Sequence, residues 1–254
     1  MNSLVLCETQ QQVTTLTLNR PGRHNSLIPD LLEDLLDGLA QATGSHARAV
    51  VLQANGRSFS TGGDVRWFFE HRAEPATAAL EIVGLLNRVL LAMIDLAAPI
   101  VTCVHGTVTG GSLGLVLASD VVLVSPEATF TPYYGPLGFS PDGGWTALLP
   151  ALIGAKRAEE CLFTNRTIGA AKAVEWGLAN RIVPADRIRE QVLSTARTIA
   201  GMKAGSIERS KRLVWGDRSQ IAARLEQERQ QFVTQIQSGE AREGMEAFLA
   251  GRTR

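Results

Sequence analysis

Two glycine-rich turns are the first residues of this chain that could take part in catalysis. Residues 55–65 (NGRSFSTGGDV) follow the apolar run Ala49–Ala54, and residues 106–114 follow the apolar run Ile100–Val104. A turn between a buried strand and the start of a helix leaves backbone N–H groups without partners and directs them at one point. Two such turns could bind an anion, or an oxygen that becomes negative during a reaction. Glycine turns with a purely structural role are the alternative.

Asp142 is the second feature with chemical potential. Between residues 121 and 158 the acidic residues are Glu127 and Asp142. Glu127 stands in the segment SPEA, which is typical of a solvent-exposed turn. Asp142 lies between Pro141 and two glycines, with aromatic residues nearby, so burial could raise its pKa and make it a general base. A helix N-cap or turn aspartate is the alternative, because proline and glycine neighbours favour both.

The elements that must position these residues alternate between strands and helices. Strands are predicted at 4–7, 13–18, 49–54, 100–104, 121–124 and 128–131, and helices at 29–42, 65–71, 77–95 and 112–119. Thr77 is the predicted N-cap of the long helix. After Trp145 the pattern is mostly helical, with a brief strand at 181–183 and helices at 186–200, 203–215, 219–237 and 240–249. The alternation predicts an α/β core with terminal helices appended.

Composition narrows the function classes. The 254 residues include 25 Lys plus Arg and 25 Asp plus Glu, a balance that argues against binding nucleic acid or a membrane surface. Glycines and Pro99 interrupt the uncharged run 97–119, which argues against a membrane span. The three cysteines and four histidines are scattered, so we expect no metal site. The first residues lack a signal-peptide pattern, and we expect a cytoplasmic protein.

Six segments in order along the chain resemble the crotonase (enoyl-CoA hydratase/isomerase) superfamily. NRPGRHNSL resembles its Asn-Arg-Pro opening, SFSTGGDV its F-x-x-G-x-D-[IV] segment, and HGTVTGGSLGLVLASDVV its glycine turn and helix start. ATFTPYYGPLGFSPDGGWTALLPALIG, EWGLANRIVP and REGMEAFLAGR resemble its later segments. The resemblance implies an α/β fold: a crotonase-like spiral of ββα units over residues 1–195, and a C-terminal helical trimerisation region over 196–254.

The same resemblance implies the ligand and its contacts. Members bind acyl-CoA thioesters and stabilise an enolate, so coenzyme A would be part of the substrate and no separate cofactor is expected. The assembly would be a homotrimer or a dimer of trimers. By position, the N–H groups of Gly63 and Gly111 would form the oxyanion hole. Coenzyme A would run along Gly63, Asp64, Val65 and Arg66, with Arg23 contacting a phosphate.

The sequence departs from the family where hydratases carry two glutamates. The aligned positions hold Gly114 and Tyr134, and neither side chain can act as a carboxylate. Asp142 in its P-D-G-G context resembles the single aspartate of some isomerases in this family, which favours an enoyl-CoA isomerase with Asp142 as its base. Tyr134 could orient substrate or water, or only pack. Hydratase, thioester hydrolase, a carbon–halogen-type lyase and a non-catalytic CoA-thioester binder remain alternatives.

The aromatic segment RWFFEH is the last candidate part of the site. Its three consecutive aromatic residues, Trp67, Phe68 and Phe69, are predicted to wall an acyl pocket. Packing in the core is the alternative, because aromatic residues on a helix most often serve the core.

Overall fold

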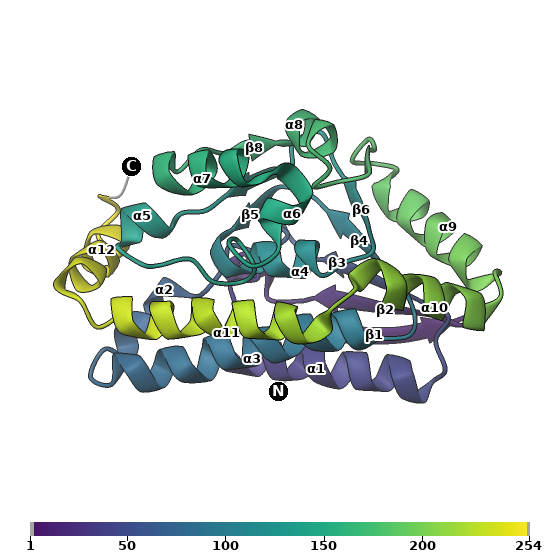
Figure 1. Cartoon of the computed structure of the whole chain (residues 1–254), viewed down its shortest axis with the longest axis horizontal. Helices are drawn as coiled ribbons and strands as arrows, with labels where there is room; N and C mark the ends of the chain where they lie inside the picture. The colour runs from purple at the N-terminus through teal and green to yellow at the C-terminus, as the bar shows by residue number, and fades with distance from the viewer. Residues whose placement is uncertain (1–2, 253–254) are drawn as a thin grey trace.

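The computed structural model describes residues 3–252, in which a twisted, mostly parallel sheet forms the scaffold (Figure 1). Its strands are β1 (Val5–Gln10), β2 (Val13–Leu18), β3 (Ala49–Ala54), β4 (Ile100–Val104), β6 (Val121–Val124) and β9 (Arg181–Ile182). Across the sheet the order is β1-β2-β3-β4-β6-β9, with β1 and β2 an antiparallel hairpin and the later pairs parallel. The predicted strands at 4–7 and 13–18 and the α/β core are confirmed.

A small second sheet brings the two glycine turns together. It contains β5 (Thr107–Thr109), β7 (Thr129–Thr131) and β8 (Ile168–Gly169). Strand β5 was not predicted, because three residues between glycines are too short to show a period. It pairs with β7 in parallel, and its Val108 also bridges to Ser60 in the first glycine turn.

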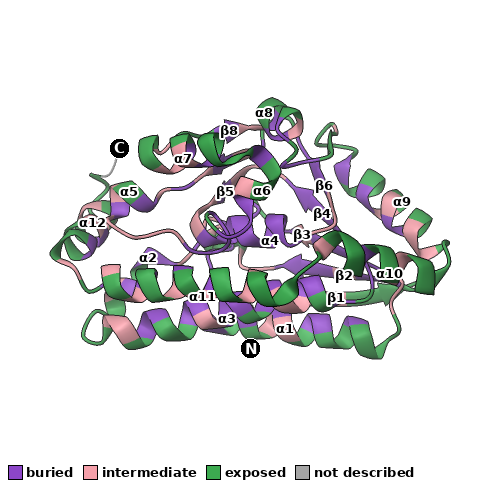
Figure 2. Cartoon of the chain, viewed as in Figure 1, coloured by how far each residue is buried: buried purple, intermediate pink, exposed green. Residues whose placement is uncertain are grey.

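Long helices cover one face of the main sheet. Helices α1 (Pro29–Gly44), α3 (Pro75–Asp95) and α11 (Arg218–Gln235) lie side by side along the lower edge of Figure 1. Figure 2 shows that their inward surfaces are buried and their outward surfaces exposed. The prediction that Thr77 caps α3 is wrong: Glu74 is the N-cap and Pro75 opens the helix, because the fixed φ of proline suits a first helical turn.

By length and composition, one helix in residues 3–252, α3, could cross a membrane, and 61% of its most apolar window is buried inside the protein. Helices α1 and α11 pack against it. A core helix of a folded domain has the same composition.

Six shorter helices of the described chain lie between the strands and the long helices along the sequence. They are α2 (Val65–Glu70), α4 (Leu113–Leu117), α5 (Tyr134–Leu137), α6 (Leu149–Ile153), α7 (Ala155–Thr164) and α8 (Ala170–Glu175). The predicted helix at 112–119 is therefore shorter than expected, and α5 was not predicted. Two of the six, α2 and α5, line the cavity described below. Helix α12 (Gly239–Leu249) packs against α2 and α5, so the end of the chain lies beside the glycine turns.

Helix α9 (Ile188–Ala200) covers the other face of the main sheet. Its Ile188, Val192 and Ala196 pack against strand residues such as Val51 and Val101. The division expected between residues 195 and 196 stays a prediction, and both residues lie in this helix. Helices α10 (Ala204–Trp215), α11 and α12 follow it.

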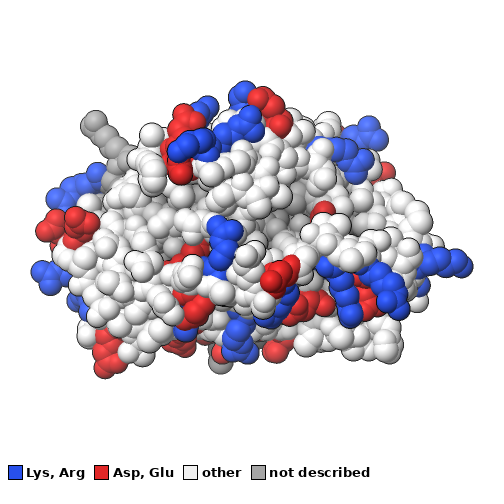
Figure 3. Space-filling view, viewed as in Figure 1, with Lys and Arg blue, Asp and Glu red and all other residues white. Residues whose placement is uncertain are grey.

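Charged side chains of both signs are interspersed over the face in Figure 3. This face carries no broad field of one sign, as the equal totals of 25 basic and 25 acidic residues predict.

Candidate active site

The two glycine turns contact each other through their backbones. The Ser60 carbonyl accepts hydrogen bonds from the Thr109 N–H (3.2 Å) and the Ser112 hydroxyl (2.9 Å). A Cβ on Gly62, whose φ is +73°, would lie 2.6 Å from the Thr109 carbonyl oxygen. Glycine is required there because only its backbone can approach so closely in this conformation. The residues that follow, Gly63 and Gly111, therefore line one cavity of about 430 Å³.

Both of these amides are available to a ligand. The N–H of Gly63 has no acceptor among residues 3–252. Gly111 lies in the 3-10 helix Gly110–Ser112, whose opening N–H groups have no acceptor within the helix. An oxygen bound between two such donors would be stabilised most when it becomes negative.

Asp142 lies directly beside Gly111. A Cβ on Gly111 would lie 2.8 Å from Asp142 Oδ1 and 3.1 Å from its Oδ2, and Asp142 is 8% exposed. The Tyr134 hydroxyl donates a 2.6 Å hydrogen bond to Oδ1. The helices before and after Asp142 have Tyr133 and Leu148 as their N-caps, so Asp142 does not cap either of them.

The surroundings of Asp142 suit a proton acceptor at neutral pH. Burial raises the pKa of its carboxyl to about 7, with a further increase from the negative charge of Glu228 and an opposing effect from the Tyr134 hydrogen bond. Burial also raises the pKa of Tyr134 well above its ordinary value, so its hydroxyl remains a donor. Near neutral pH, Asp142 can both accept and return a proton.

Glu228 of α11 holds the segment that follows Asp142, and the sequence reasoning missed it. Its buried carboxylate accepts from the N–H groups of Gly144 (2.8 Å), Thr146 (2.7 Å) and Ala147 (2.9 Å) and from the Thr146 hydroxyl (2.7 Å). A signal existed: the buried residues of α11 are Leu225, Glu228 and Phe232, a helical stripe with a carboxylate in the middle.

Glu228→Gln is expected to lower kcat about tenfold and to move the midpoint of the kcat/KM pH profile below pH 7. The amide removes the negative charge that raises the pKa of Asp142, and its NH₂ group cannot accept from all the N–H donors that surround it. Steady-state rates between pH 5 and 9 measure both effects. Glu226→Gln is the matched control, because Glu226 pairs with Arg229 on the same helix. An unmoved midpoint would show that Glu228 has only a structural role.

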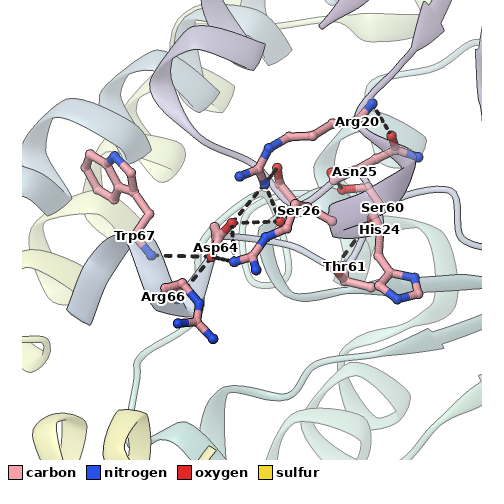
Figure 4. Close-up of polar contacts among 10 residues, drawn as sticks. Arg20, His24, Asn25, Ser26, Ser60, Thr61, Asp64, Arg66 and Trp67 are labelled. Carbon is pink, nitrogen blue, oxygen red and sulfur yellow. Dashed lines mark hydrogen bonds and ion pairs between the residues drawn. The ribbon is translucent and has the colours of Figure 1, made fainter. Parts of the chain in front are cut away.

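Asp64 fixes the wall at the cavity mouth (Figure 4). Its carboxylate accepts from the N–H groups of Arg66 (3.0 Å) and Trp67 (3.3 Å), which caps α2, and it pairs with Arg20 (2.8 Å) and Arg23 (3.1 Å). Burial alone would raise the pKa of Asp64, but the Arg20 hydrogen bond and the two guanidinium charges outweigh burial and lower it. The carboxylate of Asp64 is therefore occupied within the protein.

Two cations remain at the mouth for an anionic ligand. The side chain of Arg23 is 44% exposed despite its pairing with Asp64. Arg66 is exposed, and in Figure 4 its side chain points away from the cluster around Asp64. Both residues line the cavity, as do Val65 and Tyr134. The predicted phosphate contact at Arg23 stays a prediction, and Arg66 is placed to share it.

The prediction for the aromatic segment is right for one residue of three. Phe68 lines the cavity. Trp67 instead stacks on His71 at 4.2 Å, and Phe69 lies under the Arg72 guanidinium at 4.2 Å. Consecutive residues of a helix point about 100° apart, so three in a row cannot share one wall.

Comparisons with known proteins agree with this arrangement. The sequence model of the enoyl-CoA hydratase/isomerase family matches residues 8–253. A Mycobacterium tuberculosis protein named probable enoyl-CoA hydratase EchA12 is 35% identical over 236 residues, which are 89% of this chain and 82% of that protein. The 1,2-epoxyphenylacetyl-CoA isomerase of Escherichia coli is 27% identical over 259 residues, covering 100% and 98%.

A comparison with solved structures gives the same result. The crystal structure of an enoyl-CoA hydratase/isomerase from Pseudoalteromonas atlantica superposes with a TM-score of 0.87 at 29% identity, covering 98% of each chain. The family match extends over the glycine turns, Asp142 and the terminal helices alike. The chain belongs to the enoyl-CoA hydratase/isomerase family, the crotonase superfamily, and is an acyl-CoA enzyme of that family.

Proposed function

We propose that this enzyme shifts the double bond of an enoyl-CoA, with Asp142 as the base and the N–H groups of Gly63 and Gly111 as the oxyanion hole. The observation that carries the proposal is the position of a buried carboxylate, with its pKa raised to about 7, beside the Gly111 backbone. A base so close to the oxyanion donors would face the carbon next to the thioester carbonyl.

The reaction needs one group that moves one proton. Asp142 removes a proton from the α carbon of a 3-enoyl thioester, and the electron pair moves to the thioester oxygen. The amides of Gly63 and Gly111 stabilise that oxygen because they favour its negative form over the neutral carbonyl. The proton returns from Asp142 to the γ carbon, the double bond moves to the 2,3 position, and the carboxylate is restored.

Hydration fits this cavity less well. Within the described chain the acidic residues that line it are Asp64 and Asp142, and Asp64 is occupied by two arginines. At position 114 any side chain would meet the Gly143 carbonyl oxygen at 2.7 Å. Tyr134 donates its hydroxyl to Asp142 and gives no second carboxylate. Among the described residues that line the cavity, no second carboxylate is therefore available to activate water.

The remaining features of the proposal concern the assembly and its ligands. We propose a homotrimer or a dimer of trimers in the cytoplasm, with coenzyme A bound as part of the substrate and no other cofactor. The exposed Leu213 (82%) and Val214 (85%) of α10 support an interface between copies, since large apolar side chains so exposed commonly mark contacts.

The test is the product formed from a 3-enoyl-CoA in deuterated water. We expect a 2-enoyl-CoA whose mass differs from that of the substrate only by exchanged deuterium, because the proton on Asp142 can exchange before it is returned. Mass spectrometry and NMR of the double-bond position measure this. With the 2-enoyl-CoA supplied as substrate in a parallel assay, a product heavier by one D₂O would identify a hydratase, and free coenzyme A from either thioester would identify a thioester hydrolase. Binding without turnover of any thioester would contradict catalysis.

A further inference from the structure

An unusual share of the chain's aromatic rings lines the cavity. Four of the eight phenylalanines and both tyrosines do so. The rings come from segments far apart in sequence: Phe68 in α2, Tyr133, Tyr134 and Phe139 in and beside α5, Phe232 in α11 and Phe248 in α12. Aromatic residues make up 6% of the sequence, so their concentration here calls for a reason specific to this cavity.

Three of these rings form one cluster, the phenyl triad of Phe68, Phe139 and Phe232. Their centroids are 5.8 Å apart for Phe68 and Phe139, 5.7 Å for Phe68 and Phe232, and 5.4 Å for Phe139 and Phe232. The interplanar angles are 66°, 42° and 63°. Tilted and edge-to-face contacts of this kind fix the orientation of each ring. The triad is therefore a preformed aromatic wall.

The triad lies beside the reacting end of the proposed site. A Cβ on Gly63 would lie 2.8 Å from Phe68 Cε2, so the Phe68 ring borders the proposed oxyanion donor. Phe139 is three residues before Asp142. The triad would thus contact the acyl group near its α to γ carbons, whereas Arg23 and Arg66 stand at the mouth where the phosphates would lie.

On the basis of the proposed function, we propose that the acyl group of the substrate carries an aromatic ring close to the reacting carbons. A planar ring can add edge-to-face contacts to the three fixed phenyl rings, a gain beyond apolar burial that an alkyl chain or saturated ring lacks. The substrate class is then an aryl-substituted enoyl-CoA.

The test compares thioesters that have no double bond to shift, so its result does not depend on isomerase chemistry. Isothermal titration calorimetry measures Kd for phenylacetyl-CoA, cyclohexylacetyl-CoA and octanoyl-CoA. The first two have rings of equal carbon number and differ in aromaticity. We expect phenylacetyl-CoA to bind at least fivefold more tightly than either of the others. Equal or tighter binding of cyclohexylacetyl-CoA or octanoyl-CoA would overturn the aromatic substrate class while leaving the proposed isomerase untouched.

Variants of the triad test whether its three rings cause the preference for a phenyl group over a cyclohexyl group. Phe139→Leu and Phe232→Leu keep an apolar side chain and are expected to reduce the phenyl-over-cyclohexyl preference to twofold or less, with the Kd for cyclohexylacetyl-CoA changed by less than threefold. Phe163→Leu is the control, because Phe163 is 82% exposed and does not line the cavity. Thermal melts verify that each variant is folded. A phenyl preference that persists in both triad variants would contradict the assignment.

Discussion

Asp142→Asn is expected to lower kcat for double-bond migration about 1000-fold while leaving the Kd for a CoA thioester within threefold of its original value. The amide cannot accept the α proton, and general acid–base catalysis typically contributes about 10²- to 10⁴-fold. Binding should survive because asparagine preserves the shape and can still accept the Tyr134 hydrogen bond. Single-turnover rates and calorimetric Kd values measure the two effects separately. An unchanged kcat would exclude Asp142 as the base.

The same variant should change how stability depends on pH. The pKa of Asp142 is raised from an ordinary 3.8 to about 7 by burial, so folding favours its protonated form. Its contribution to the unfolding free energy is fully present below about pH 4 and is lost as pH rises through about 7, a difference of roughly 4 kcal/mol. Urea unfolding at pH 5 and pH 8 should show that Asp142→Asn lacks this decrease. Equal pH dependence in both proteins would mean that the pKa is not raised.

Gly111→Ala is expected to lower kcat by about 10²- to 10³-fold with little change in KM. The new methyl group would lie 2.8 Å from Asp142 Oδ1 and 2.9 Å from Leu86 Cδ2, so it would displace both the proposed base and the backbone that carries the proposed oxyanion donor. Loss of one such donor alone costs about 3 to 4 kcal/mol of transition-state stabilisation. Steady-state kinetics measures kcat and KM separately.

Gly169→Ala is the control for this substitution. A Cβ on Gly169 meets nothing within 4 Å, and its position in β8 is away from the cavity lining. Its kcat should be unchanged. Overpacking at Gly111 also costs about 1 to 3 kcal/mol of stability, so circular dichroism must verify that the variant folds at the assay temperature. A folded Gly111→Ala protein with normal kcat would contradict the oxyanion assignment.

Much of the scaffold was predictable from local pattern. The strands Ala49–Ala54, Ile100–Val104 and Val121–Val124 have the bounds that their apolar runs predict, because buried β-branched runs bounded by turn residues have few other structures available. Strand β5 and helix α5 were missed because segments of three or four residues are too short to repeat a hydrophobic pattern. The start of α3 was misplaced because threonine and proline both favour a first turn.

The candidate site was also predictable in part, from local motifs. Gly63, Gly111 and Asp142 converge on one cavity, and each stood in a local motif that could be read from the sequence. Phe232 reaches that cavity, and Glu228 reaches the segment after Asp142, from a helix more than 80 residues further along the chain. Nothing local shows which strand or loop a helix stripe will contact. Tyr134 was recognised as part of the site, but its bond to Asp142 depends on the fold between residues 134 and 142.

Helices α11 and α12 are synthesised after the glycine turns and Asp142, and this order has a consequence for biosynthesis. A ribosome completes both glycine turns and Asp142 well before it adds Glu228, Phe232 and Phe248. Until these three residues emerge and pack in place, the segment after Asp142 lacks the carboxylate that accepts hydrogen bonds from its N–H groups. The cavity also lacks part of its aromatic wall. A nascent or prematurely terminated chain would therefore contain the proposed catalytic groups without the complete cavity around them, so we expect activity to depend on α11 and α12.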